Sequence, residues 1–162
     1  MGRRREYVFN DEWEVDAPIL AVFRALADST TYPTWWAPVY LSVEADGPLR
    51  VGRVAQERVK GRLFYELGVT SEIVRLEPPR ECELVVSGDL SARGLWTLAP
   101  LLGGTVWVRL EWRLDASPAT LRLLAPVLRR WDHRWAIRHA IGGLEPYARA
   151  SAAGSGSAVS ST

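Results

Sequence analysis

The chain contains two histidines, His133 and His139, which are its only imidazole groups. Both fall in a predicted C-terminal helix, where residues follow one another at 100° steps, so the two rings point to different faces. His139 shares one flank of the apolar stripe with Asp132, two turns earlier, at a rise of about 11 Å. We expect His139 and Asp132 to hold the two ends of a bound molecule and to move a proton on it. The alternative for His139 is a boundary histidine bonded to backbone or water, and for Asp132 it is a solvated carboxylate at the helix edge. His133 is expected at the surface.

Other catalytic patterns are missing from the sequence. There is no Gly-x-Ser-x-Gly elbow and no HExxH motif, and Gly94, Gly103 and Gly104 match no phosphate-binding fingerprint. The different faces of the two histidines disfavour a shared zinc site. The sequence therefore disfavours a hydrolase, a metalloenzyme and a nucleotide-dependent enzyme, and we expect no cofactor. The type of catalysis that the sequence still allows is proton transfer in a pocket that contains little water.

Two further polar residues are predicted to point into the interior from strands. Tyr65 shares its parity with Leu67 and Val69, so its ring should face inward and its hydroxyl should find a partner. That partner is a ligand or another side chain, and Tyr65 is the third candidate for proton transfer. Glu57 shares its parity with Val59, which favours an inward position beside a ligand. The alternative for Glu57 is a strand that faces water on that side.

The eight tryptophans are more informative than the charges. They recur at positions predicted to face inward: on a short helical segment, on two strands and, as an i,i+4 pair, on the stripe of the long helix. Core packing is the alternative for any one of them, but so many large rings exceed the needs of a small core unless they line a space. Flat and rigid walls suit an aromatic or polyene ligand. The predicted ligand-binding residues are Trp35, Trp36, Glu57, Trp96, Trp112, Leu128, Trp131 and Trp135.

A simple order of strands and helices positions these residues. Residues 7–16 are rich in β formers, and a helix follows with Asp16 as its cap and Pro18 in its first turn. A second short helical turn carries residues 32–36. Six strands are predicted at residues 39–45, 53–60, 62–76, 81–90, 92–98 and 105–115, with turn signals between them. A long amphipathic helix runs from residue 117 to about 149 and bends at Pro126.

The short connections between the strands favour an antiparallel meander over parallel βαβ units. The last strand alternates cleanly, with Val106, Val108 and Leu110 on one face and charged residues on the other. We therefore predict an α+β fold in which a curved seven-stranded antiparallel sheet wraps around the long C-terminal helix, with two short helices after the first strand. Because a concave sheet cannot contact a nearly straight helix along its whole length, a cavity is expected between them.

Composition narrows the class of protein. The chain has 162 residues, 20 basic and 19 acidic side chains and a net charge of +1, which favours one domain and disfavours nucleic acid as a partner. The single cysteine, Cys82, makes no internal disulfide and fits a reducing cytoplasm. No apolar run is long enough to span a membrane. We expect a flexible N-terminus at residues 1–6, a ligand-binding domain at 7–149, a disordered tail at 150–162, and a monomer or homodimer.

Local motifs occur in an order typical of one superfamily. They are WEVDAP at 13–18, YPTWW at 32–36, GDL at 88–90, GLW at 94–96, GTV at 104–106, AP at 125–126 and WDH at 131–133. With them, residues 7–149 resemble the polyketide cyclase/dehydrase-like group of the START-related helix-grip superfamily, which includes the birch-pollen-allergen-like proteins. The resemblance implies a helix-grip fold with a hydrophobic cavity for a lipophilic or aromatic molecule. It also implies Trp-Asn-His on the last helix, where this chain has Asp132.

Two functions follow from the resemblance. The first is a cofactor-independent cyclase, aromatase or dehydratase that acts on a hydrophobic polyketide-type molecule. The alternative is a protein that binds or carries a lipophilic or aromatic ligand without reacting with it. A third possibility, an interaction protein with a tryptophan-rich surface, is disfavoured because the rings follow inward parity.

Overall fold

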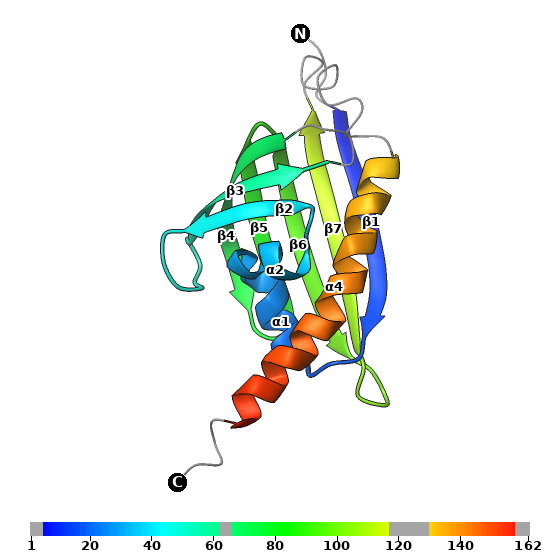
Figure 1. Cartoon of the computed structure of the whole chain (residues 1–162). Helices are drawn as coiled ribbons and strands as arrows, with labels where there is room; N and C mark the ends of the chain where they lie inside the picture. The colour runs from blue at the N-terminus through cyan, green and yellow to red at the C-terminus, as the bar shows by residue number, and fades with distance from the viewer. Residues whose placement is uncertain (1–4, 62–65, 117–129, 158–162) are drawn as a thin grey trace.

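The computed structural model describes residues 5–61, 66–116 and 130–157. Within these residues the element order is one strand, three short helical segments, six strands and one long helix (Figure 1). The elements are β1 (Arg5–Val15), α1 (Ile19–Ala27), η1 (Ser29–Thr31), α2 (Tyr32–Trp35), β2 (Tyr40–Ala45), β3 (Val54–Lys60), β4 (Glu66–Glu77), β5 (Glu81–Gly88), β6 (Ser91–Pro100), β7 (Val106–Ala116) and α4 (Arg130–Ser157).

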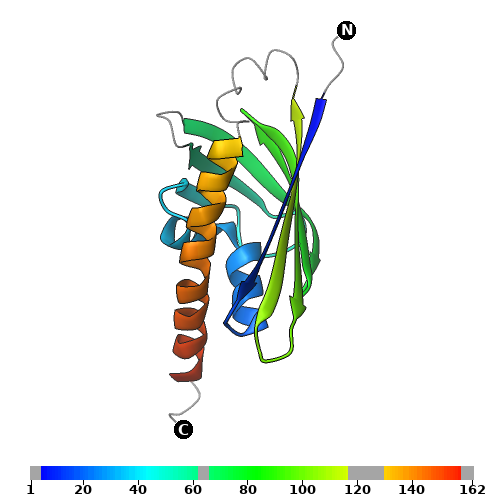
Figure 2. The same cartoon turned by 90° about the vertical axis from the view of Figure 1, so that its right-hand side faces the viewer.

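The seven strands form one antiparallel sheet in the order β1-β7-β6-β5-β4-β3-β2. Strands β2 to β7 follow one another as a meander, and the first strand, β1, pairs with the last, β7. Their antiparallel pairing runs from Arg5 opposite Ala116 to Val15 opposite Val106. Helix α4 lies across the concave side of the curved sheet, with α1 between its lower part and the strands (Figure 2). The predicted helix-grip fold, with its curved seven-stranded sheet, long C-terminal helix and short helices after the first strand, is confirmed.

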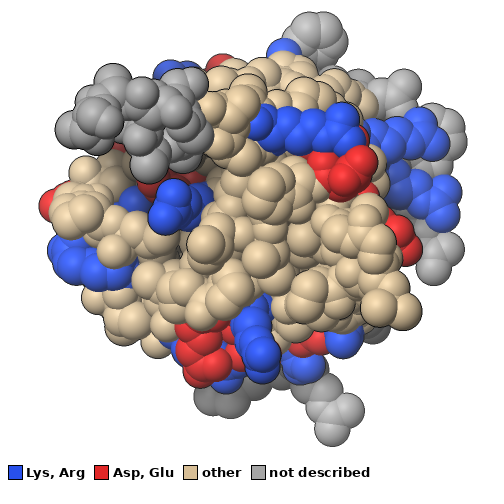
Figure 3. All heavy atoms as spheres, turned by 90° about the horizontal axis from the view of Figure 1, so that it is seen from below, with Lys and Arg blue, Asp and Glu red and all other residues tan. Residues whose placement is uncertain are grey.

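Alternation along the strands separates the core from the charged face. In β7, Val108 and Leu110 are fully buried, whereas Arg109 and Arg113 contact Glu111 on the convex side. Each large apolar side chain removed from water contributes roughly 1.5–3 kcal/mol, while exposed ion pairs contribute little. Seen from below, acidic and basic side chains gather around the rim of the molecule and other residues cover its middle (Figure 3).

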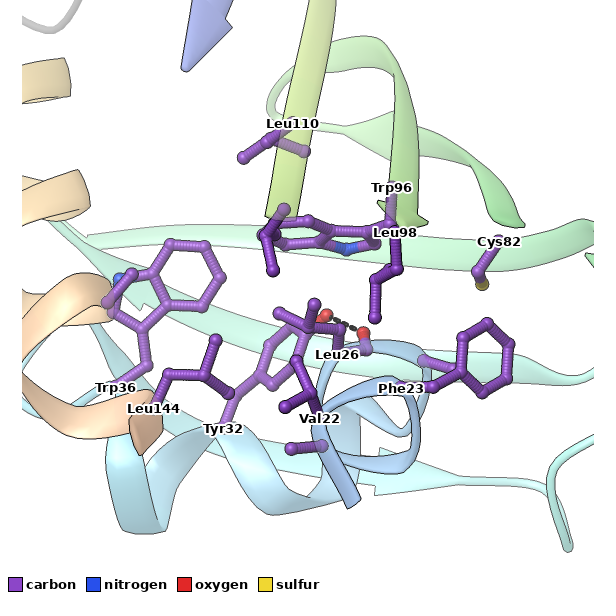
Figure 4. Packing of buried hydrophobic residues seen from close by; sticks show 14 of the residues in the cluster. Val22, Phe23, Leu26, Tyr32, Trp36, Cys82, Trp96, Leu98, Leu110 and Leu144 are labelled. Carbon is purple, nitrogen blue, oxygen red and sulfur yellow. Dashed lines mark hydrogen bonds between the residues drawn. The ribbon is translucent and has the colours of Figure 1, made fainter. Parts of the chain in front are cut away.

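Helix α1 fills the lower half of the concave side. Its apolar face buries Val22, Phe23 and Leu26 against the sheet, where Trp96 is 2% exposed (Figure 4). The Tyr32 hydroxyl donates a hydrogen bond to the Leu26 carbonyl, which ties α2 to the end of α1.

Three expectations about element ends differ from the structure. Asp16 does not cap α1, since the helix begins after Pro18 without a side-chain cap, and the Asp16 carboxylate instead accepts a hydrogen bond from Arg149 at 2.6 Å. Strand β1 already begins at Arg5, so the boundary predicted at residue 7 lies too late. Helix α4 continues to Ser157, so the tail predicted from residue 150 on is helical over its first part; alanines there favour the helix.

Part of the predicted long helix lies outside the described residues, including Leu128 and the bend expected at Pro126. Within the part that the structure describes, no helix is long and apolar enough to cross a membrane.

Candidate functional site

A cavity of about 170 Å³ lies between the first turns of α4 and the sheet. The described part of its wall is mostly apolar and comes from β1, the α2–β2 connection, the start of β2, the end of β3, the start of β4, the turn before β6, β7 and α4. Three indole rings, those of Trp36, Trp112 and Trp135, contribute to it. The space expected between the sheet and the C-terminal helix is therefore present.

Two of the three indoles are held by specific contacts. Trp36 follows α2, and its Nε1 donates a hydrogen bond of 2.8 Å to the Ala136 carbonyl on α4. Trp112 on β7 lies opposite Gly94 on β6, where a Cβ atom would meet the indole ring at 3.1 Å. Glycine at position 94 thus makes room for the ring beside the cavity.

A histidine and a carboxylate meet at the edge of the cavity. His133 lines it, and its Nε2 lies 2.5 Å from Oδ2 of Asp11 on β1. The imidazole also stacks on Phe9, another lining residue, with ring centroids 4.4 Å apart and an interplanar angle of 25°. The His133 and Asp11 side chains are 19% and 23% exposed. Because an ionised carboxylate only accepts hydrogen bonds, Nε2 carries the proton and Nδ1 keeps its lone pair in the neutral ring.

The surface position expected for His133 is therefore wrong. Helical periodicity gives the direction of a side chain relative to the apolar stripe, and His133 does lie off that stripe. The cavity lies between the first described turns of α4 and the sheet, however, so it borders a wider arc of the helix than the stripe alone. Strand β1 reaches this arc and supplies Asp11 and Phe9.

The sequence reasoning missed Asp11 and Phe9. One signal could have found Asp11. From Tyr7 to Val15 the odd-numbered residues of β1 face inward, and Asp11 is the one charged residue among these five. A charge placed on an apolar face is costly unless it has a partner.

Trp35, Trp96 and His139 are brought near the cavity but do not belong to its described lining. Trp35 is 4% exposed and stacks on Trp36 at 5.3 Å, and Trp96 packs in the core. His139 donates from Nδ1 to the Trp135 carbonyl at 2.9 Å, with its ring 4.8 Å from the Trp135 ring. These three residues support the wall from behind.

Glu57 points inward, as its parity predicts, and is 5% exposed. It accepts a hydrogen bond of 2.7 Å from Ser71 Oγ and does not line the cavity. Burial raises the pKa of the Glu57 carboxyl, although the hydrogen bonds from Ser71 and Ser29 and the charge of Arg53 act in the opposite direction. Glu57 therefore belongs to a buried polar group below the cavity.

The remaining candidates are not placed as side chains. Tyr65 and Leu128 lie outside the described residues, and Asp132 and Trp131 are described only as part of the backbone of α4. Over the described stretches, no group of three or more histidine, cysteine or acidic side chains is arranged to hold a metal ion.

A second hollow, of about 470 Å³, lies between α1 and the C-terminal half of α4. Several residues around it, such as Leu20, Arg24 and Ser151, are exposed. The lining of this hollow includes more polar groups, such as Arg24, Asp28 and Thr31, so the apolar cavity is the better candidate for binding a hydrophobic molecule.

The fold and the cavity define a helix-grip protein with a site for a small apolar molecule. The family model described as polyketide cyclase / dehydrase and lipid transport matches residues 8–148, and the chain belongs to this family. Among curated proteins, no sequence matches the chain.

Several solved structures share the fold at low sequence identity. The Zhui aromatase/cyclase from Streptomyces sp. R1128 is 17% identical with a TM-score of 0.72, over 91% of this chain and 98% of that one. A protein from Thermus thermophilus is also 17% identical with a TM-score of 0.72, over 90% of this chain and 99% of its own. A point mutant of norcoclaurine synthase from Thalictrum flavum, bound to a transition-state analogue, is 13% identical with a TM-score of 0.64, over 89% and 96%.

Proposed function

We propose that the protein binds a hydrophobic aromatic or polyketide-type molecule in the cavity and acts on it as a cofactor-independent cyclase, aromatase or dehydratase. The observation that carries this proposal is the His133–Asp11 pair at the edge of a mostly apolar cavity. Membership of the polyketide cyclase / dehydrase family and the likeness to an aromatase/cyclase support it.

The chemistry needs one group that exchanges protons. In the proposed reaction, Nδ1 of His133 takes a proton from a carbon between two carbonyl groups of the substrate. The resulting enolate forms a carbon–carbon bond to a second carbonyl carbon, and the imidazolium returns the proton to the new alkoxide oxygen. For dehydration, His133 takes a second carbon-bound proton and returns it to the hydroxyl group, which leaves as water.

The surroundings of His133 suit this role. The Asp11 carboxylate orients the ring and stabilises the imidazolium that forms, which is the role of the acid in other His–Asp pairs. The described wall is mostly apolar, and a polar group that bonds to a carbonyl oxygen acts more strongly in such surroundings than in water. Tyr40, which lines the cavity, is placed to donate such a hydrogen bond.

The other candidates take supporting roles in this proposal. Trp36, Trp112 and Trp135 provide the flat walls. His139 holds the backbone and ring of Trp135, and the proton-transfer role first considered for it passes to His133. The parts assigned to Asp132, Tyr65, Leu128 and Trp131 stay predictions.

The test is a cyclisation assay with a linear tetraketide presented as its N-acetylcysteamine thioester, with products resolved by mass spectrometry. We expect the wild-type protein to accelerate ring formation, and His133→Ala to lower the rate about 10²-fold or more. Arg134→Ala, at an exposed position next to His133 on the same helix, is the matched control and should keep most of the rate. A wild-type rate equal to that in buffer would contradict the proposed enzymatic activity.

The second candidate function is binding or carriage. The cavity alone favours it, since it needs no proton transfer. In that case tetraketide or flavonoid ligands quench tryptophan fluorescence and are recovered unchanged, with equal affinity in wild type and His133→Ala. For either function, the single buried Cys82 favours a reducing compartment such as the cytoplasm, and we propose a monomer or homodimer without a nucleic-acid partner.

A further inference from the structure

Lys60 is the only lysine in the chain, and it lies at the cavity. It is the last residue of β3, where its amide donates a hydrogen bond of 2.7 Å to the Val39 carbonyl, and Val39 lines the cavity as well. The Lys60 side chain is half-buried. Its flexible four-carbon stem lets the ammonium group follow a bound molecule.

The ammonium group of Lys60 has no counter-ion among the described side chains. Neighbouring Arg58 on the same strand differs, because its guanidinium pairs with Glu66 at the surface. Among the described residues that line the cavity there is no acid, and the histidine is already paired with Asp11. Lys60 therefore brings to this part of the wall a positive charge that has no partner among the described side chains.

Tyr40 adds a second unused donor. It lines the cavity next to Trp36, with ring centroids 5.0 Å apart, and its hydroxyl makes no hydrogen bond within the described part of the chain. Burial raises the pKa of Tyr40 well above its ordinary value, and the charge of Glu57 raises it further, so the hydroxyl keeps its proton. A protonated hydroxyl and an ammonium group both donate hydrogen bonds, and an anionic oxygen accepts from both.

The size of the cavity limits the apolar part of the ligand. An apolar cavity of ~150 Å³ holds one benzene ring, and this one measures about 170 Å³. The space between the indoles thus fits a single aromatic ring with a short substituent. A larger ring system needs the wall residues to move.

We propose that this cavity selects a one-ring aromatic carboxylate, with its ring between Trp36, Trp112 and Trp135 and its carboxylate on Lys60 and the Tyr40 hydroxyl. The inference rests on the cavity used in the proposed function and names its ligand class. It does not depend on proton transfer by His133.

The experiment compares benzoate with benzamide, which has the same shape and no charge, by calorimetry on the full chain. We expect benzoate to bind more tightly than benzamide. Lys60→Met should weaken benzoate about tenfold to a hundredfold, the loss expected for a charge-assisted hydrogen bond, and leave benzamide unchanged within twofold. Arg58→Met is the matched control on the same strand and should change neither affinity.

A second measurement needs no substitution. Reductive methylation with 13C-formaldehyde keeps the positive charge and labels Lys60 as the only lysine. Its dimethyl signal should shift on titration with benzoate and stay in place with benzamide. Three results would each overturn the inference. They are equal affinity for both probes, no binding of benzoate, and a Lys60 signal that does not shift when benzoate is added.

The two proposals fail separately. If Lys60→Met leaves benzoate binding intact while the tetraketide is still cyclised, the ligand class is wrong and the proposed reaction stands. If the tetraketide is not cyclised but benzoate binds through Lys60, the reaction is wrong and the ligand class stands.

Discussion

Gly143 of α4 lies directly against the backbone carbonyl of Trp35, so close that a Cβ atom at position 143 would overlap the carbonyl oxygen. The neighbouring Gly142 is exposed and has no atom within 4 Å of where its Cβ would lie. This contact brings α2 against α4 and seats Trp36 beside Ala136. The distance between the two helices at the cavity therefore depends on one glycine.

Gly143→Ala should destabilise the protein, because the backbone of α2 cannot yield as a side chain can. Overpacking of this kind costs about 1–3 kcal/mol. Gly142→Ala is the control and should raise the free energy of unfolding by about 0.5–1 kcal/mol, since alanine favours the helix. Urea unfolding of both variants measures the difference. Equal stabilities for the two would contradict the contact between α2 and α4.

Gly94→Val should shrink the cavity. A side chain at position 94 meets the Trp112 ring, which has to move toward the space it lines. We expect the affinity for benzamide to fall at least several-fold and the near-UV circular dichroism of the indoles to change. Gly68→Ala is the control, since its Cβ would make ordinary contact with the exposed Asp89 at 3.7 Å. Unchanged benzamide affinity in Gly94→Val would contradict the placement of Trp112 in the cavity wall.

The fold was predictable because local signals determine it. Alternating residues in segments such as residues 106–114 give each strand an apolar face, and the turn residues between them enforce antiparallel neighbours. The same parity correctly turned Glu57 inward. Parity cannot tell a packed interior from a hollow one, however. Trp96 and Trp112 both face inward, and only the position of α1, which fills the lower half, decides which of them reaches the cavity.

The contact between His133 and Asp11 was not predictable from local patterns. The two residues are 122 positions apart, and they meet because β1 pairs with β7 in a particular register while α4 crosses above. A one-residue slip of β1 would turn Asp11 to the convex side. The sequence predicts that Asp11 points inward, but it does not indicate which residue of the helix Asp11 contacts.

Removing Arg53 and removing Asp28, which form an ion pair, should lower the stability of the protein by different amounts. Arg53 is 3% exposed and its Nη1 lies 2.8 Å from Oδ1 of Asp28, whose side chain is 32% exposed. Asp28→Asn leaves the buried Arg53 guanidinium without its counter-charge. Breaking a buried ion pair in this way lowers the stability by about 3–5 kcal/mol. Arg53→Met leaves Asp28 with water and with the two hydrogen bonds from Thr30, so we expect a smaller loss. Chemical denaturation at pH 7 measures both. A larger loss for Arg53→Met would contradict this assignment of the buried partner.

Glu57 should make the protein less stable as the pH rises. Burial raises the pKa of Glu57 above its ordinary value of 4.5, so the folded state holds this proton at pH values where the unfolded chain has released it. The native state then binds more protons than the unfolded state, and the free energy of unfolding falls as the pH rises from about 4.5 through the raised pKa. Glu57→Gln keeps an acceptor for Ser71 and has no proton to lose, so this decline should disappear from its stability curve. Exposed Glu72 on β4 provides the control, and Glu72→Gln should retain the wild-type slope. Urea unfolding at intervals between pH 4 and 8 compares the three proteins, and parallel curves for wild type and Glu57→Gln would show that the Glu57 carboxyl is already ionised in the folded state.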